Sequence, residues 1–175
     1  AFLGLGILLF TGVLSWEDII SEKNAWSTFV WLTTLLMMTN FLAEFGLMSW
    51  FSGKVGDSVS GFSWPLALAL LAVIYFYSHY MFASLTAHAT SMFSVFLIVA
   101  LSTGAPSYLA VLLLAFFSNL CASTTHYGTG TAPVYFAINY VKVSDWWRVG
   151  AIVSLANIFI WATVGGLWWK LIGLW

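Results

Sequence analysis

Two polar islands lie inside a long uncharged stretch of this sequence. No Lys, Arg, Asp or Glu occurs between residues 57 and 142, yet residues 84–91 and 123–133 are rich in hydroxyl groups, and each contains a histidine. The second island also carries the run Gly-Thr-Gly-Thr-Ala-Pro, whose glycines and proline disfavour a continuous helix. A broken helix exposes free N–H groups, which attract anions, and free C=O groups, which attract cations. Such segments can bind a carboxylate without any arginine.

The islands offer a ligand three kinds of group: hydroxyls, imidazoles and closely approachable backbone. His88 and His126 are ligand donors, proton carriers or packed neutral residues, and the sequence leaves these alternatives open. His79 lies outside both islands and is predicted to be structural. The hydroxyls come from Ser84, Thr86, Thr90, Thr124, Thr125, Thr129 and Thr131.

The alternative role for a membrane hydroxyl is helix packing, because Ser and Thr commonly lie between membrane helices. This role is accepted for the scattered Thr33, Thr34 and Thr163. It does not explain the islands, since lipid satisfies no backbone polar group, and irregular backbone is tolerated only in protein or beside water. Two interrupted helices in an uncharged run indicate a substrate site near the bilayer midplane.

The composition excludes a water-soluble globular fold, and together with the apolar runs described below it predicts an all-α integral membrane protein. Hydrophobic residues make up 62% and charged residues 6% of the chain, against roughly a quarter charged in soluble domains. Eleven Trp and seven Tyr are typical of membrane interfaces. A formal net charge of −1 argues against a nucleic-acid partner. The single cysteine, Cys121, excludes an intrachain disulfide or a Cys-based cluster and is predicted to be a small apolar helix residue. No metal or cofactor is predicted from these features.

The first part of the chain, residues 1–62, is predicted to hold a truncated helix, an interfacial segment and a transmembrane helix. The chain begins inside an apolar run, which leads us to expect further residues upstream. Ser15 is a predicted helix cap, with acidic residues in the first turn. Residues 26–48 form the predicted spanning helix, and residues 50–62, rich in Gly and Ser, are predicted to be an interfacial link.

The second part, residues 63–141, is predicted to hold the transport-type region. Pro65 opens a helix that ends at about residue 77 or 79. Residues 80–102 are either one helix or two half-helices of a re-entrant hairpin with the first island at its tip. Residues 108–122 form a helix that stops at the second island, and residues 134–140 resume it. The third part, residues 142–175, comprises an interfacial turn to residue 148 and a last transmembrane helix.

The residues of both islands resemble one transporter family. Residues 82–88, Phe-Ala-Ser-Leu-Thr-Ala-His, are similar to a re-entrant hairpin of the divalent anion/sodium symporter family. Residues 125–133, followed by Asn-Tyr-Val at 139–141 and Asp-Trp-Trp at 145–147, closely resemble its antiporter branch. That branch contains citrate/succinate and tartrate/succinate exchangers and the plastid 2-oxoglutarate/malate translocator. The end of the chain, residues 166–175, is also similar.

The resemblance implies half of an inverted-repeat transporter, the C-terminal repeat, in a homodimer that also contains a missing N-terminal repeat. It implies a site for one carboxylate of a C4–C6 di- or tricarboxylate, held jointly by a hairpin tip with Ser84 and Thr86 and a broken helix with Thr129 and Thr131. The predicted binding residues are Ser84, Leu85, Thr86, His88, Thr125, His126, Gly128, Thr129, Gly130, Thr131 and Pro133.

Leu85 departs from the family pattern. Sodium-coupled members carry Ser-Asn-Thr where this chain has Ser84-Leu85-Thr86, and leucine offers sodium no oxygen. We therefore expect an antiporter, not an enzyme, with His88 supplying positive or hydrogen-bonding character. The alternatives are a sodium symporter of the same family, with sodium near Ser84 and Thr86, and a haem-binding membrane anchor using His79 and His88. The expected location is the bacterial inner membrane, with the plastid inner envelope as the alternative.

Overall fold

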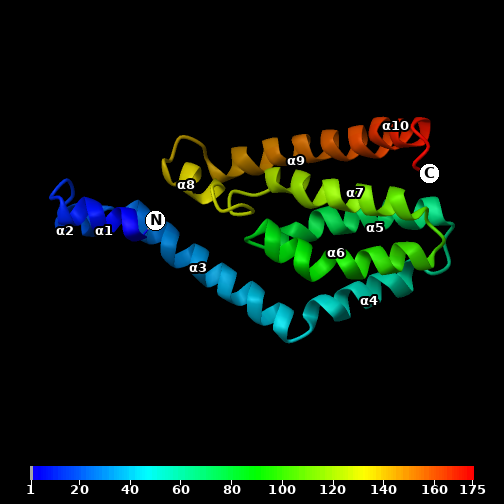
Figure 1. Ribbon diagram of the computed structural model, residues 1–175, viewed down its shortest axis with the longest axis horizontal. Helices are drawn as coiled ribbons and strands as arrows, with labels where there is room; N and C mark the ends of the chain where they lie inside the picture. The colour runs from blue at the N-terminus through cyan, green and yellow to red at the C-terminus, as the bar shows by residue number, and fades with distance from the viewer. Residues whose placement is uncertain (1) are drawn as a thin grey trace.

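The computed structural model describes residues 2–175, and every regular element in that range is helical (Figure 1). Four helical runs are long and apolar enough to cross a membrane, namely Lys23–Glu44, Trp64–Met81, Leu85–Ser102 and Val143–Leu171. The elements are α1 (Phe2–Phe10), α2 (Trp16–Ser21), α3 (Lys23–Glu44), α4 (Leu47–Val59), α5 (Trp64–Ser78), η1 (His79–Met81), α6 (Leu85–Ser102), α7 (Ser107–Leu120), η2 (Cys121–Ser123), α8 (Ala132–Ala137), α9 (Val143–Ile160), the π-helical η3 (Trp161–Gly165) and α10 (Gly166–Leu171).

Local sequence signals fix several helix starts. Ser15 caps α2 in a reciprocal capping box with Asp18, as its position before two acids predicted. Pro65 lies in the first turn of α5, where its missing N–H costs no hydrogen bond. Ser84 caps α6, and its Oγ accepts a hydrogen bond from the Ala87 N–H at 3.3 Å. The predicted spanning helix over 26–48 is confirmed as α3, which begins three residues earlier and ends four residues earlier than predicted.

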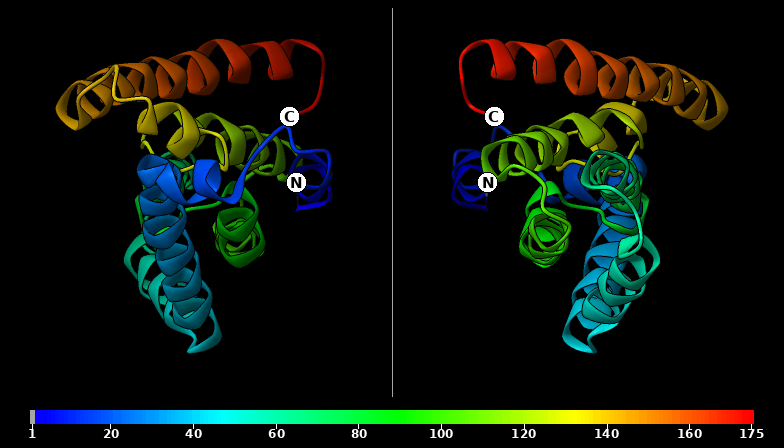
Figure 2. Two further views of the ribbon diagram at one scale, coloured as in Figure 1. Left: turned by 90° about the vertical axis from the view of Figure 1, so that its left-hand side faces the viewer. Right: turned by 90° about the vertical axis from the view of Figure 1, so that its right-hand side faces the viewer.

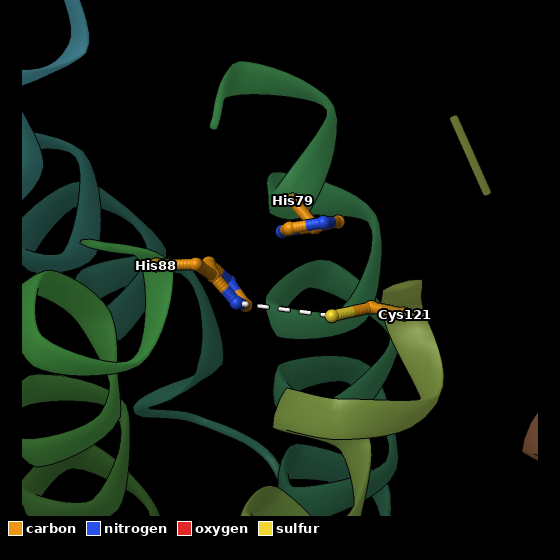
Figure 3. Close-up of side chains that lie close together, drawn as sticks. All are labelled: His79, His88 and Cys121. Carbon is orange, nitrogen blue, oxygen red and sulfur yellow. Dashed lines mark hydrogen bonds between the residues drawn. The ribbon is translucent and has the colours of Figure 1, made fainter. Parts of the chain in front are cut away.

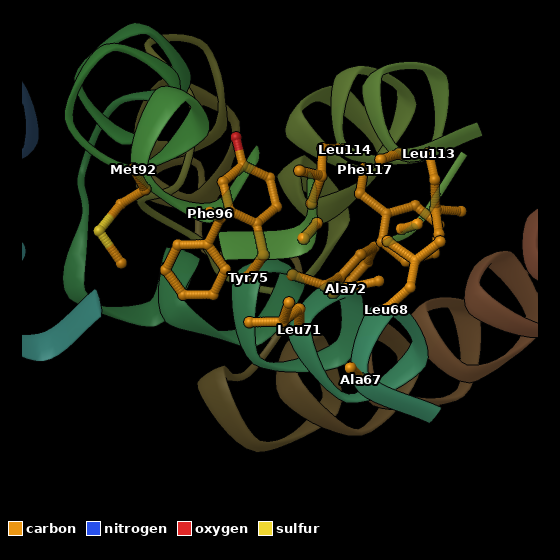
Figure 4. Close-up of a cluster of buried hydrophobic side chains, with 14 of the residues drawn as sticks. Ala67, Leu68, Leu71, Ala72, Tyr75, Met92, Phe96, Leu113, Leu114 and Phe117 are labelled. Carbon is orange, nitrogen blue, oxygen red and sulfur yellow. The ribbon is translucent and has the colours of Figure 1, made fainter. Parts of the chain in front are cut away.

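The core lies among α4, α5, α6 and α7, which pack side by side. Figure 4 shows Tyr75 from α5 beside Phe96 from α6, while Phe76 and Phe117 pack edge to face across α5 and α7 with ring centroids 5.3 Å apart. All four rings are buried. Figure 2 shows α9 and α10, in orange to red, along the top of the molecule, and α3 and α4, in blue to cyan, below.

The predicted link over residues 50–62 is wrong, because residues 47–59 form the helix α4. Its Met48, Ser52 and Val59 are buried, and α4 packs along α6. A Cβ at Gly56 would lie 3.2 Å from a methyl of Val99, so glycine allows the two helices to approach closely. Packing of one face outweighs the weak helix propensity of this Gly- and Ser-rich segment.

Residues 80–102 were predicted to be either one helix or two half-helices of a re-entrant hairpin, and the structure has a single helix from Leu85 onwards. The first island forms the opening turns of this helix, α6, and not the tip of a hairpin within residues 80–102. The descending arm is α5, and the chain turns through η1 and an extended Phe82. The hairpin therefore comprises residues 64–102. Residues 142–148 were predicted to form an interfacial turn. In the structure they are helical from Val143 onwards, and Asp145 lies in the first turn of α9.

The predicted break at the second island is confirmed. Irregular backbone separates η2 from the six-residue α8, which begins at Ala132. After the break, the chain continues as α8. This short helix packs against α3 and lies near the start of α3 (Figure 1). α7 and α8 therefore form an interrupted helix whose gap is open to side chains from the hairpin.

Candidate functional site

The turn of the hairpin meets the break in the interrupted helix. The ring Nε2 of His79 in η1 lies 3.1 Å from the Gly128 carbonyl oxygen. From the opposite direction, the Tyr127 hydroxyl donates to the Tyr80 carbonyl at 2.9 Å. Two hydrogen bonds to backbone carbonyls thus join segments almost fifty residues apart in the sequence. The turn directly before the first island is thus held against the second island.

Gly128 makes this close approach possible. A Cβ at this position would lie 2.5 Å from His79 Nε2 and 2.8 Å from Thr125 Oγ1, both well inside van der Waals contact. Gly130 differs, since nothing lies within 4 Å of its Cβ position. Of the two glycines in the island, Gly128 is required by packing, whereas Gly130 leaves open space.

The start of α6 presents a small polar surface. Thr86 is exposed, and Ser84 and Leu85 are half-buried. Ser84 Oγ is already used as the helix cap. The Leu85 side chain packs against the apolar core. Thr86 is therefore the first-island hydroxyl with the greatest freedom to contact a ligand.

The break presents a second polar surface around Gly130. Thr131 and Gly130 are exposed, and Thr129 is half-buried. Thr129 Oγ1 accepts from the Ala132 N–H at 3.0 Å, the first N–H of α8, and lies 3.3 Å from Thr131 Oγ1. The exposed hydroxyls and the backbone of residues 129–131 can donate and accept hydrogen bonds at this surface.

Four other predicted binding residues are buried. Gly128 and Pro133 lie inside the packing of the break. Thr125 is fully buried, and its Oγ1 has no hydrogen-bond partner. His88 is fully buried, with Nε2 2.9 Å from Ser78 Oγ and 3.1 Å from the Tyr75 carbonyl oxygen. The His88 side chain points into the helix bundle and is not accessible to an anion in this arrangement. It was expected to supply positive or hydrogen-bonding character to the anion.

His126 is half-buried among aromatic side chains. Its Nδ1 accepts a hydrogen bond from Trp147 Nε1 at 3.1 Å. The Phe136 and Trp31 rings lie with centroids 4.6 and 5.9 Å from that of the imidazole. His126 therefore links the break to α3, α8 and α9, and its position is set by three elements at once.

Residues 58–141 contain no Lys or Arg, so the groups of this stretch that can attract an anion are neutral. Hydroxyls and helix starts must supply the attraction. A model of the sodium:sulfate symporter transmembrane region matches residues 1–175. The chain belongs to this family.

Several curated relatives of this family match the chain along its full length. A putative malate transporter, YflS, of Bacillus subtilis (strain 168) is 52% identical over 100% of the chain, which covers 37% of that protein. The chloroplastic dicarboxylate transporter 1 of Spinacia oleracea is 48% identical over 100% of the chain and 31% of its own length. The citrate/succinate antiporter of Escherichia coli (strain K12) is 33% identical over 99% of the chain and 35% of its own length. The chain thus spans about a third of these relatives.

The contact by which α9 supports the candidate site was not predicted from the sequence. A Cβ at Gly150 would lie 2.8 Å from the carbonyl oxygens of Ser123 and Thr124, so α9 touches the backbone of the break. Four residues along, Ser154 Oγ lies 3.0 Å from the Tyr77 hydroxyl of α5. The spacing of Gly150 and Ser154 is a small-xxx-small pattern, typical of close helix packing in membranes, and it could have revealed this contact.

The haem alternative does not fit the geometry. The His79 and His88 rings contact each other directly, with centroids 5.2 Å apart. Tyr75 and Phe82 cover His88 with ring centroids at 4.5 and 5.1 Å. Axial ligands bind iron from opposite faces of a flat macrocycle, and no plane between these two rings is free to admit one.

Proposed function

We propose that the protein containing this chain is a secondary transporter of small dicarboxylates or tricarboxylates, such as succinate, malate, 2-oxoglutarate, citrate or tartrate, and that it works as an antiporter. The observation that carries the proposal is the junction of the hairpin turn with the helix break inside an uncharged region. The names of the relatives, which are a malate transporter, dicarboxylate transporters and a citrate/succinate antiporter, support the same substrate class.

One carboxylate of the substrate would be held by the exposed hydroxyls of Thr86 and Thr131 and by the backbone around Gly130. Neutral donors bind an anion less tightly than a guanidinium pair does, because charge-assisted bonds are the stronger ones. Moderate affinity suits a carrier that must also release its substrate. The other part of the site would come from the remaining two-thirds of the protein, as an N-terminal repeat in a homodimer.

Exchange rather than sodium symport is supported by Leu85. This residue stands at the centre of Ser84-Leu85-Thr86, and its side chain packs against the apolar core, so it brings no oxygen to a cation. Without a bound cation, moving an anion across a membrane separates charge. Obligatory exchange of two similar anions keeps that separation small. Sodium near Ser84 and Thr86 is the alternative, in which backbone carbonyls would replace the missing side-chain oxygen.

The experiment uses the full-length protein in proteoliposomes loaded with unlabelled succinate. Uptake of labelled succinate or citrate is followed in sodium buffer and in choline buffer. We expect uptake that requires internal dicarboxylate and does not change when choline replaces sodium. Uptake into empty vesicles that depends on sodium would contradict exchange and identify a symporter. Absence of uptake under both conditions would overturn the proposed substrate class.

A matched pair of variants tests the site itself. Thr131→Ala removes an exposed hydroxyl at the break, whereas Thr163→Ala removes a hydroxyl that donates to the Phe159 carbonyl within its own helix. We expect the first change to raise the KM for exchange roughly tenfold, the effect of about 1.4 kcal/mol of lost substrate binding. The second should leave KM unchanged. Equal kinetics for both variants would remove Thr131 from the site.

A further inference from the structure

Three buried side chains from separate elements lie close together (Figure 3). His79 comes from η1, His88 from the first turns of α6 and Cys121 from η2, and all three have no solvent exposure. One ring nitrogen of each histidine and the cysteine sulfur lie within 4.8 Å of one another. The carboxylate site does not use these groups, because they point into the bundle.

The hydrogen bonds of His88 determine which of its nitrogens is free. Its Nε2 lies 3.1 Å from the Tyr75 carbonyl oxygen, which can only accept, so Nε2 carries the proton. Ser78 agrees with this assignment, since its hydroxyl proton is directed to the same carbonyl at 2.7 Å. The lone pair of the neutral ring is therefore on Nδ1. That atom lies 3.9 Å from Cys121 Sγ (Figure 3).

His79 is fixed in the same tautomer by a different carbonyl. Its Nε2 donates to the Gly128 carbonyl oxygen at 3.1 Å, which leaves the lone pair on Nδ1. This Nδ1 is buried and has no hydrogen-bond partner. Burying an acceptor without a partner is unfavourable, and such an atom in a folded protein calls for an explanation. Thr125 Oγ1 is also buried without a partner.

This arrangement is that of metal-binding histidines. A ligating imidazole typically donates its other N–H to a backbone carbonyl, which fixes the tautomer and the ring orientation. With bonds of about 2.3 Å to sulfur and 2.0 Å to nitrogen, a trigonal site places sulfur and nitrogen about 3.7 Å apart. The separation of His88 Nδ1 and Cys121 Sγ already approaches this value. The three ligand atoms lie within 4.8 Å of one another. A movement of about 1 Å therefore brings all three to the distances of a trigonal site.

The absence of charged side chains from the stretch of sequence that forms the cluster favours a monovalent over a divalent cation. The stretch from residue 58 to residue 141 holds no charged side chain that could balance an ion. A monovalent cation bound to one thiolate and two neutral imidazoles gives a site of zero net charge, whereas a divalent cation leaves one positive charge in a low-dielectric interior. Thiolate is a soft ligand that favours Cu⁺.

We propose that His79, His88 and Cys121 form a buried site for a soft monovalent metal cation of the Cu⁺ class. On binding, the thiol proton leaves to solvent and a sulfur–metal bond replaces the S–H bond, with no change in oxidation state. The bound ion joins the hairpin turn, the start of α6 and the end of α7. It therefore stabilises the framework that positions both polar surfaces.

The test uses Ag⁺, a soft monovalent probe that stays in one oxidation state, with the purified full-length protein in chloride-free, reducing-agent-free detergent solution. Silver bound per polypeptide is measured after equilibrium dialysis, together with the midpoint of thermal unfolding. We expect the wild-type protein to bind one Ag⁺ more than Cys121→Ala does. We also expect Ag⁺ to raise the unfolding midpoint of the wild-type protein and not that of the variant.

Two histidine variants separate a three-ligand site from a thiol that binds silver alone. His79→Gln should weaken silver binding roughly tenfold or more, whereas His126→Gln, which lies outside the cluster, should leave it unchanged. Equal silver binding by the wild-type protein and Cys121→Ala would overturn the proposal. Unchanged affinity in His79→Gln would also overturn it, and that variant keeps the thiol, so its result does not depend on how Cys121→Ala folds.

Discussion

Gly128 shows how one missing side chain controls the junction. Its Cβ position lies within 3 Å of both His79 Nε2 and Thr125 Oγ1, two groups that are themselves fully buried. Neither ring nor hydroxyl can swing into solvent to make room. Replacement by a larger residue must therefore push the hairpin turn away from the helix break, and it breaks the hydrogen bond that His79 makes to the Gly128 carbonyl.

We predict that Gly128→Ala lowers the free energy of unfolding by about 1–3 kcal/mol, the usual range for overpacking a well-filled interior. Gly130→Ala is the matched control, since open space surrounds its Cβ position. The measurement is SDS-induced unfolding of the full-length protein in bicelles, followed by Trp fluorescence. A Gly128→Ala protein as stable as Gly130→Ala would show that the turn and the break are not held in close contact.

The side chains of the candidate site were predictable by type but not by exposure. The sequence indicated hydroxyls at 84–91 and 123–133, and their chemistry follows from residue identity alone. Which of them face a ligand depends on packing between distant segments. α9 contacts the backbone of Thr124, which is buried, and α5 lies against the buried His88. The spacing of residues within a single helix does not show which distant segments will pack against them.

At the scale of the elements, helix breaks that contain Gly and Pro were predictable from the sequence, whereas a break formed by apolar residues was not. The interruption before Ala132 follows from the local chain. The turn at Phe82 and Ala83 does not, since both side chains are apolar and buried. It is held by distant groups, among them Tyr127, which donates to the Tyr80 carbonyl, and Thr39, whose Oγ1 lies 3.4 Å from the Met81 carbonyl. Helix α4 was missed for the same reason, because its partner α6 stabilises it.

The capping box of α2 lowers the pKa of the Asp18 carboxyl. The Ser15 backbone N–H donates to Asp18 Oδ2 at 2.8 Å, and the Ser15 hydroxyl donates to it at 2.7 Å; both favour the charged form and bring the pKa below 3.8. A lowered pKa in the folded state stabilises α2 above the unfolded pKa. That stabilisation is lost as the pH falls through the lowered value.

We predict that Ser15→Ala raises the pKa of Asp18 towards 3.8 without reaching it, because the backbone donor remains. Ser21→Ala is the control, since the Ser21 hydroxyl donates to the Asp18 carbonyl and not to its carboxylate. The carboxyl carbon of Asp18 is followed by NMR during acid titration in micelles. An Asp18 pKa that is the same in both variants would show that the serine hydroxyl does not stabilise the charge.

Helix α9 is predicted to hold the break in place through Gly150. A methyl group there would meet the carbonyl oxygens of Ser123 and Thr124 at 2.8 Å, and backbone cannot rotate away as a flexible side chain can. We expect Gly150→Ala to lower the free energy of unfolding by about 1–3 kcal/mol and to reduce exchange activity, because α9 is forced off the interrupted helix. Gly166→Ala is the control on the same helical run, where nothing lies within 4 Å. Two variants of equal stability and activity would place α9 away from the break.

At the scale of the whole molecule, the large apolar side chains exposed on this chain show what surrounds it. Leu155 is 64% exposed on α9 and Ile98 is 65% exposed on α6, both within helical runs long enough to cross a membrane. Leu155 lies about 18 Å along the run that starts at Val143, by the rise of an α-helix, and therefore near the centre of a bilayer core about 30 Å thick. Whether lipid or the rest of the protein covers this face, its surroundings are apolar.

A lysine placed at Leu155 should therefore cost about 2.5–3.5 kcal/mol of insertion free energy, the range found for a charge at the centre of a membrane helix. Tyr140→Lys is the comparison, because Tyr140 is 88% exposed and lies outside the four spanning runs, where water can solvate the ammonium group. Leu155→Ala controls for the lost leucine side chain. The measurement is the fraction of α9 inserted during synthesis into membranes, scored by glycosylation sites on either side of the helix. We expect a large loss of insertion for Leu155→Lys alone. If Leu155→Lys and Tyr140→Lys insert equally well, Leu155 faces water, and α9 lines an aqueous path instead of the apolar boundary of the transporter.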